Sequence, residues 1–147
     1  MTTAMKSDRY TFHIEFDVRD YELDSEGIVN NAVYLHYLEY TRHVFCKEAG
    51  YGFAQMQADG LVPVMSHIEA SYRSPLRSGD VVLSELWVES RGPRFIFHQR
   101  ISSRDERRVA VEAVVTIVAI ENGRLSRGDT LRQALKHVIT VTDDNDE

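Results

Sequence analysis

A single stretch of this chain has the spacing of a long helix, and it limits the folds that the other residues can build. From Asn30 to Glu48 the apolar side chains recur every three or four residues, as on one face of a helix. Asn30 and Asn31 can accept hydrogen bonds from the first unpaired backbone N–H groups, and Gly50 follows as a stop. We therefore expect one long helix with a buried face: Tyr34, Tyr37, Leu38, Thr41, Val44 and Phe45.

Five other segments have the alternation or the apolar content of strands: residues 9–18, 61–73, 81–90, 95–103 and 108–121. Short polar turns join the last four, which predicts antiparallel pairing. In the second segment one face is expected to carry Val62, Val64, Ile68, Ala70 and Tyr72. The last segment is apolar enough for a central strand that is covered on both faces. The fold class is therefore α+β, with an antiparallel sheet of about five strands and the long helix across one face.

The 147 residues fit a single domain, with a core over about 9–121 and a short helix and acidic tail over 129–147. A net charge of −6 argues against general nucleic-acid binding. No apolar run is long enough to span a bilayer, and the first residues lack the apolar core of a signal peptide. The one cysteine, Cys46, cannot form an internal disulfide, so we expect a cytoplasmic protein with no membrane partner.

The most reactive pattern lies just before the helix, where Asp24 and Gly27 precede Asn30 and Asn31. A carboxylate beside the free N–H groups of a helix start places a base or nucleophile next to donors for a developing anion. Gly27 allows a tight turn between the two groups. The alternative is structural, because an aspartate before a glycine is also typical of an ordinary turn, and asparagines are common caps.

Other helix residues offer further candidates. Glu39 is a second possible catalytic carboxylate. His36 and His43 share its face, but two imidazoles and one carboxylate on one helix are weak grounds for a metal site, and we expect none. His43 and Cys46 are spaced for a dyad, yet a thiol in the middle of a helix is more often packed than reactive.

Two motifs carry a family resemblance. The first is D24-S25-E26-G27-I28-V29-N30-N31-A32-V33-Y34, followed by Y37-L38-E39 and Arg42; the second is Y72-R73-S74-P75-L76-R77-S78-G79-D80. Together with the element order, they resemble the hotdog-fold acyl-CoA thioesterases of the 4-hydroxybenzoyl-CoA thioesterase type. The resemblance covers roughly residues 9–121.

The resemblance implies a hotdog fold and hydrolysis of an acyl-CoA to the free acid and CoA, without a cofactor. It implies that Asp24 attacks the thioester carbonyl or activates water to do so. It also implies that the backbone N–H of Asn31 polarises that carbonyl. Gly27, Asn30 and Tyr34 belong to the same motif and are expected to bind substrate. The alternative is a non-catalytic module that binds acyl-CoA or acyl carrier protein, because hotdog folds also serve that purpose.

Phosphates of CoA need cations, and arginines gather at the expected strand ends and turns: Arg73, Arg77, Arg91, Arg94, Arg104, Arg107 and Arg108. Among them Arg73 and Arg94 are our predicted substrate contacts. His67 and Glu69 share a strand face and are candidates for a pocket lining from a second subunit. The sheet has an open edge and an apolar strand to cover, so we expect a homodimer or a dimer-of-dimers tetramer.

Overall fold

The computed structural model describes residues 9–142. In chain order its elements are β1 (Phe12–Asp17), the 3-10 turn η1 (Asp20–Glu22), α2 (Asn31–Glu48), α3 (Phe53–Ala58), β2 (Leu61–Tyr72), β3 (Val81–Arg91), β4 (Arg94–Ser103), β5 (Val109–Glu121), β6 (Arg124–Leu125), α4 (Asp129–Leu135) and β7 (Thr140–Thr142). The long helix and the five main strands therefore lie where the sequence predicts them. The acidic tail falls outside the described residues.

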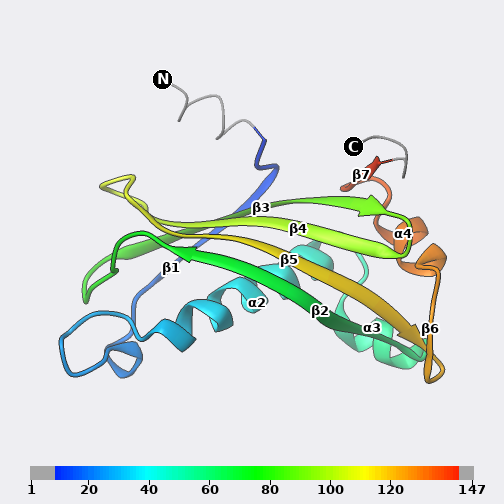
Figure 1. The fold of residues 1–147 in the computed structure, drawn as a ribbon, viewed down its shortest axis with the longest axis horizontal. Coiled ribbons are helices and arrows are strands. Elements are labelled where there is room, and N and C mark those ends of the chain that lie inside the picture. Colours follow the sequence, from blue (N-terminus) through cyan, green and yellow to red (C-terminus); the bar gives the residue numbers. More distant parts are fainter. Residues whose placement is uncertain (1–8, 143–147) are drawn as a thin grey trace.

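One curled sheet holds all the strands, in the order β1-β3-β4-β5-β2. The five main strands pair antiparallel, while the short β7 runs parallel to the end of β3. Figure 1 shows α2 lying across the concave face of this sheet, with α3 and α4 beyond its C-terminal end. This arrangement confirms the predicted α+β architecture of a sheet wrapped around one long helix.

The helix α2 forms because its apolar stripe meets aromatic side chains from the sheet. Its buried residues are Tyr34, Tyr37, Leu38, Thr41, Arg42, Phe45 and Cys46. Phe45 contacts Phe12 edge to face at 5.4 Å, and Tyr37 contacts Phe16 at 4.9 Å between ring centroids. The helix ends before Gly50, whose φ of 96° lies in the left-handed region that favours glycine. None of the described helices has the length and apolar character of a membrane span.

Three hydrogen bonds fix α2 against the middle of the sheet. The hydroxyls of Thr41 and Ser84 lie 2.6 Å apart in the core. Arg42 donates through Nη1 to Oε1 of Gln99 at 3.0 Å, and the Gln99 amide donates to the carbonyl of Leu38 at 3.1 Å. Burial lowers the pKa of Arg42, because a charged guanidinium loses solvation inside the protein. The Gln99 side chain thus ties a buried cation and the helix backbone to β4.

A bulge in β2 overturns the predicted alternation of that strand. The pairing with β5 shifts register between Met65 and His67. Because the side-chain period of a strand is two, one extra residue turns the following side chains to the opposite face. Val62 and Val64, 53% and 41% exposed, therefore face outward, whereas Ile68 and Ala70 pack against the core. The expectation that these residues share one face was wrong.

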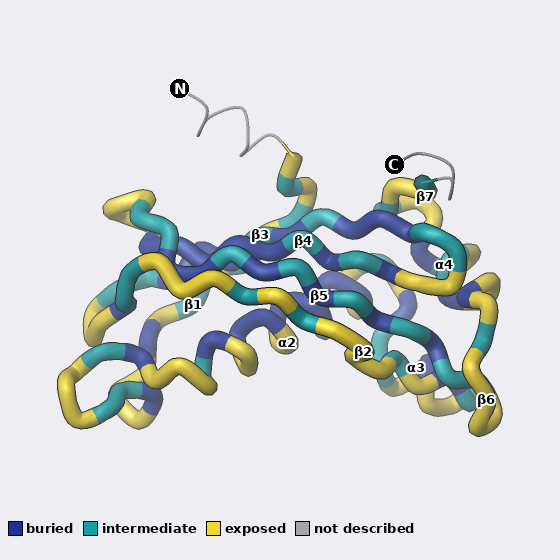
Figure 2. Tube along the Cα trace, in the orientation of Figure 1, coloured by how far each residue is buried: buried dark blue, intermediate teal, exposed yellow. Residues whose placement is uncertain are grey.

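The strand β5 is central in the sheet, as predicted, but its two faces differ. Alternate residues from Val111 to Ala119 are buried beneath the helices. The residues between them, from Val114 to Ile120, are only partly covered. Figure 2 shows buried and partly buried residues along β5, and β2 largely exposed. Within one chain, the predicted cover on both faces is therefore incomplete.

The Arg42–Gln99 contact gives a test of how the helix is anchored. Gln99→Ala leaves the buried guanidinium without its side-chain acceptor, so the free energy of unfolding should fall by about 3 kcal/mol. The double variant Arg42→Met with Gln99→Leu removes the charge as well and should regain most of that loss. Urea unfolding followed by circular dichroism measures both. Equal losses in the two variants would contradict this role of Gln99.

Candidate active site

The loop between β1 and α2 is a short hairpin that ends at the helix start. The N–H of Asn30 donates to the carbonyl of Glu22 at 3.0 Å, and Leu23 and Val29 form an antiparallel bridge. At the tip, the N–H of Asp24 donates to the carbonyl of Ile28 at 2.8 Å. Backbone pairing therefore folds the loop back on itself. Asp24 lies about two residues, roughly 7 Å, beyond the Glu22–Asn30 pair from which α2 starts.

Gly27 makes the tight turn of this loop possible. Its φ is 78°, a conformation that side chains with a Cβ rarely adopt. A Cβ placed there would meet no atom within 4 Å, so backbone conformation and not lack of space requires glycine. The predicted turn at Gly27 is confirmed.

The carboxylate of Asp24 is half-buried, and only one of its two oxygens accepts hydrogen bonds from the described residues. Its Oδ1 accepts from the N–H of Glu26 at 2.8 Å and from the N–H of Ile28 at 3.4 Å. Its Oδ2 accepts no hydrogen bond from any residue between 9 and 142. One oxygen of Asp24 therefore shapes the loop, and the other is available to a substrate or a water molecule.

The first turn of α2 leaves one backbone donor free. The Asn30 side chain accepts from the N–H of Ala32 at 2.9 Å, and the Asn30 carbonyl accepts from the N–H of Val33 at 2.9 Å. The N–H of Asn31 has no acceptor among the described residues. Asn30 is thus the predicted cap, and Asn31 contributes the unpaired donor that the sequence pattern indicates.

The turn between β2 and β3 holds the helix start in place. The N–H of Val29 donates to the carbonyl of Leu76 at 2.9 Å, and the N–H of Leu76 donates to the hydroxyl of Tyr34 at 3.0 Å. Ile28 and Arg77 form a further backbone bridge. Tyr34 is buried and serves this contact within the fold, so its predicted contact with substrate stays a prediction.

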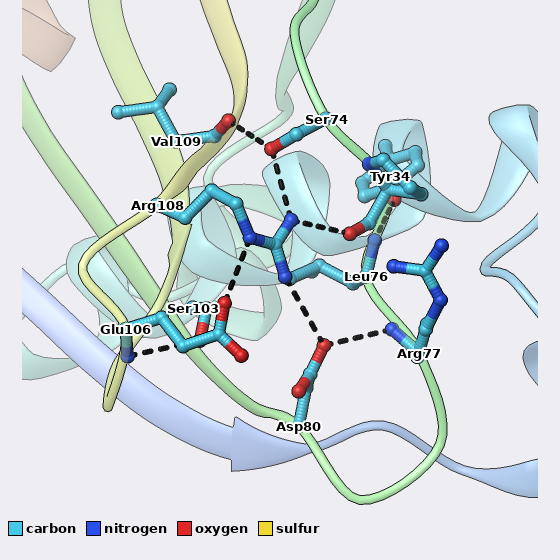
Figure 3. Close-up of polar contacts among 10 residues, drawn as sticks. Tyr34, Ser74, Leu76, Arg77, Asp80, Ser103, Glu106, Arg108 and Val109 are labelled. Carbon is cyan, nitrogen blue, oxygen red and sulfur yellow. Dashed lines mark hydrogen bonds and ion pairs between the residues drawn. The ribbon is translucent and has the colours of Figure 1, made fainter.

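Arg108 fixes the same turn from the other side (Figure 3). Its Nη1 donates to Oγ of Ser74 at 3.0 Å and to the carbonyl of Pro75 at 2.6 Å. Its Nη2 lies 3.9 Å from a carboxylate oxygen of Asp80, and its Nε donates to Glu106 at 3.0 Å. With its guanidinium used in this way, Arg108 supports the turn and has little capacity left for a phosphate.

The buried side chain of Glu22 connects the Asp24 loop to α2. Glu22 accepts from the Tyr37 hydroxyl at 2.7 Å and from the Arg19 N–H at 2.8 Å, both through Oε1. Burial and the hydrogen bond to Glu22 raise the pKa of Tyr37. Glu22 therefore turns into the protein and ties the loop to the middle of α2. This pair could not be predicted from the sequence, because a contact between residues fifteen positions apart leaves no local pattern.

The two predicted arginines occupy different ends of the sheet. Arg73 follows β2 at the Asp24 end, and its Nη2 donates to Glu112 at 3.0 Å while most of the side chain is exposed. Arg94 begins β4 and pairs with Arg91, the last residue of β3. The first residue of β3, Val81, pairs with the end of β1 next to the Asp24 loop. The ten residues of β3 between these rows span about 33 Å. One chain therefore does not bring Arg94 to Asp24.

The other candidates have contacts that favour structural roles. The ring of His43 packs against Phe53 at 3.8 Å between centroids, and burial lowers its pKa. Within residues 9–142 no three metal-binding side chains come together, so His36, Glu39 and His43 do not form a cluster. His67 Nε2 lies 3.5 Å from a carboxylate oxygen of Glu69, and both side chains are exposed on the outer side of the sheet.

The loop and the helix start thus contribute three elements to one end of the fold: a carboxylate with one free oxygen, an unpaired backbone donor, and a hydrogen-bonded turn that holds the helix start. A carboxylate can activate water or attack a carbonyl carbon directly. A fixed N–H can stabilise the negative charge that develops on a carbonyl oxygen. This geometry suits acyl transfer to water at an activated carbonyl.

Comparisons with known proteins identify the fold and the family of the chain. The crystal structure of YbaW, a probable thioesterase from Escherichia coli, matches with a TM-score of 0.73 and 26% identity, over 87% of this chain and 98% of YbaW. The fold is the hotdog fold that the sequence predicted. Residues 18–139 match the family described as the thioesterase-like superfamily, and the chain belongs to that superfamily. The narrower 4-hydroxybenzoyl-CoA type stays a prediction.

Two curated relatives share substantial sequence with the chain. ATL2, a chloroplastic acyl-acyl carrier protein thioesterase of Arabidopsis thaliana, is 34% identical over 113 residues, which are 76% of this chain and 60% of ATL2. FadM, a long-chain acyl-CoA thioesterase of Escherichia coli (strain K12), is 29% identical over 129 residues, which are 85% of this chain and 97% of FadM. The chain spans 37% and 60% of the length of the Arabidopsis relatives it matches.

The burial of Cys46 gives a test of the Cys/His alternative. Burial raises the pKa of the Cys46 thiol to about 12, so at pH 8 only about one molecule in ten thousand carries the reactive thiolate. The native thiol should react with a disulfide reagent at least about a hundredfold more slowly than the thiol of urea-unfolded protein. His43→Ala should leave the native rate equally slow. A fast native reaction that His43→Ala abolishes would indicate a dyad.

Proposed function

We propose that this chain hydrolyses acyl thioesters carried on CoA or on acyl carrier protein. The observation that supports the proposal most strongly is that the loop with the free Asp24 oxygen leads directly into the helix start with the unpaired Asn31 N–H, and that the Leu76 backbone fixes this start. Membership of the thioesterase-like superfamily supports the same chemistry.

In this mechanism the thioester carbonyl oxygen accepts a hydrogen bond from the N–H of Asn31. Asp24 takes a proton from a water molecule, whose oxygen adds to the carbonyl carbon. The negative charge moves to the carbonyl oxygen and is stabilised by the helix-start donor. When the oxyanion collapses, the carbon–sulfur bond breaks and the thiolate leaves, and Asp24 returns the proton to it. Direct attack by Asp24 would instead form a mixed anhydride that water then hydrolyses.

Both carriers are consistent with the relatives, because ATL2 is named for acyl carrier protein substrates and FadM for acyl-CoA substrates. CoA and carrier protein present the acyl group on the same phosphopantetheine arm, so the same loop and helix start can receive either. We propose acyl thioesters as the substrate class, and an aromatic acyl-CoA in the assay panel tests the narrower 4-hydroxybenzoyl type.

We further propose that two chains pair along β2. This strand has twelve residues, and among residues 9–142 it pairs with β5 alone, so one of its edges is open in the described part of the chain. Its exposed apolar side chains include Val62, Val64, Met65 and Tyr72. A long apolar edge strand that stays uncovered invites pairing with another chain. Pairing of β2 with β2 of a second copy would satisfy this edge in a closed dimer.

Such a dimer would also give Arg94 a place near the substrate. Arg94 pairs with Val118 of β5, which in turn pairs with Val64 near the N-terminal end of β2. At the C-terminal end of β2, the Tyr72 hydroxyl donates to the Asn31 carbonyl at 3.2 Å. Antiparallel pairing of two β2 strands would place the N-terminal end of one beside the C-terminal end of the other. Arg94 of the second subunit would then lie toward the Asp24 end of the first, where Arg73 already lies.

The test of Asp24 uses three matched carboxylate-to-amide variants. Asp24→Asn keeps an oxygen for the loop hydrogen bonds but loses the base, so kcat on acyl-CoA should fall by about 10²–10⁴. Glu26→Gln removes an exposed neighbouring acid and should retain the rate, and Glu39→Gln tests the second candidate carboxylate. Release of free thiol measures all three. A rate in Asp24→Asn equal to that of Glu26→Gln would end the assignment, and tight acyl-CoA binding without any thiol release would favour a non-catalytic binding module.

The test of the dimer combines mass and complementation. Sedimentation should give at least about twice the 16.9 kDa of one chain. The Arg94→Gln homodimer should show a KM for acyl-CoA raised about tenfold, since a charge-assisted hydrogen bond is lost. A purified mixed dimer of Asp24→Asn and Arg94→Gln subunits keeps one site with both groups intact, and that site should have the normal KM. A raised KM in the mixed dimer would contradict the contribution from the second subunit.

A further inference from the structure

A small cavity lies between α2 and the sheet, away from the Asp24 loop. It has a volume of about 80 Å³ and is lined by residues of α2, α3, α4, β2, β4 and β5. Most of the lining is apolar and buried, including Met56, Phe95 and Leu135. An apolar cavity of about 150 Å³ holds a benzene molecule, so this one can take about three carbon atoms.

The cavity opens toward the exposed edge of the sheet. Among its lining residues only Glu39 of α2 and Met65 of β2 are exposed, so its mouth lies between the helix and the edge strand. Arg42 and Cys46 lie farther inside on the helix, and the Arg42 guanidinium is held by Gln99. The carboxylate of Glu39 thus lies near the mouth, and the guanidinium of Arg42 lies against β4. The far wall, made by α3 and α4, is apolar.

One side of α2 runs from the proposed reaction centre to this mouth. Asn31, Leu35 and Glu39 follow one another at four-residue spacing, so they lie on one side of α2. That side faces β2 at both ends, because the Tyr72 hydroxyl donates to the Asn31 carbonyl and because Met65 shares the cavity mouth with Glu39. Leu35 lies between them and is 41% exposed, so a large part of this apolar side chain is left uncovered by the described residues.

From these observations, and resting on the proposed function, we propose that the cavity binds the end of a medium or long acyl chain whose thioester lies at Asp24 and Asn31. The eight residues from Asn31 to Glu39 advance about 12 Å along the helix. Because the zigzag of an extended acyl chain advances about 1.3 Å for each C–C bond of about 1.5 Å, about ten carbons are needed to cover that distance. Shorter acyl groups end along this side of α2, and longer ones enter the cavity, whose depth limits their length.

The test compares butyryl-CoA, which does not reach the cavity, with dodecanoyl-CoA, which does. Cys46→Leu fills the cavity and should lower kcat/KM for dodecanoyl-CoA about tenfold or more relative to butyryl-CoA, because a hydrophobic pocket discriminates single methylene groups by at least that factor. Leu135→Ala enlarges the cavity and should shift the optimum to longer chains. These opposite shifts guard against a general loss of stability in either variant.

Leu86→Ala is the matched control, because Leu86 is as fully buried as Leu135 but does not line the cavity. It should leave the ratio of the two substrates at the wild-type value. An unchanged ratio in both cavity variants, with butyryl-CoA still hydrolysed, would overturn the acyl-chain site and leave the proposed function standing. No hydrolysis of any acyl-CoA or acyl carrier protein substrate by the wild-type protein would overturn both.

Discussion

The two backbone groups of Leu76 determine where the long helix begins. Its carbonyl accepts from Val29, its N–H donates to Tyr34, and its side chain is fully buried. A helix start leaves several N–H groups unpaired, and their direction is useful only if the first turn cannot move. The turn that carries Leu76 is itself fixed by Arg108, which neutralises nearby carboxylates while bonding Ser74 and Pro75. The positions of the Asp24 loop and of the Asn31 N–H therefore depend on the contacts of Leu76 and Arg108.

The helix α2 serves several purposes with different sides. Its apolar stripe builds the core through aromatic contacts with β1, and Arg42 and Thr41 fix it to the middle of the sheet. Its start supplies the donor of the proposed reaction. Its side toward β2 leaves a large part of Leu35 uncovered and leads to a small cavity. Because β2 is also the open edge of the sheet, the same strip of surface would join subunit pairing with binding of the acyl chain.

Local patterns in the sequence were enough for the elements and for part of the site. The spacing of apolar residues predicted α2, and the two asparagines predicted its cap, because both depend on neighbouring residues. Asp24 and Gly27 could be singled out for the same reason. The bulge at Ser66 could not, because alternation continues on both sides of it and nothing local marks the extra residue. The contacts of Glu22 with Tyr37 and of Arg108 with Ser74 join distant residues, so they appear only when the chain is folded.

The central claim is that the free oxygen of Asp24 and the N–H of Asn31 meet at one thioester carbonyl. A crystal structure with an acyl-CoA analogue in which a methylene ketone replaces the thioester tests it most directly. We expect the ketone oxygen within hydrogen-bond distance of the Asn31 nitrogen, and the carbonyl carbon facing Oδ2 of Asp24, directly or through one water molecule. A ketone bound elsewhere, with the Asn31 N–H turned to solvent, would contradict it.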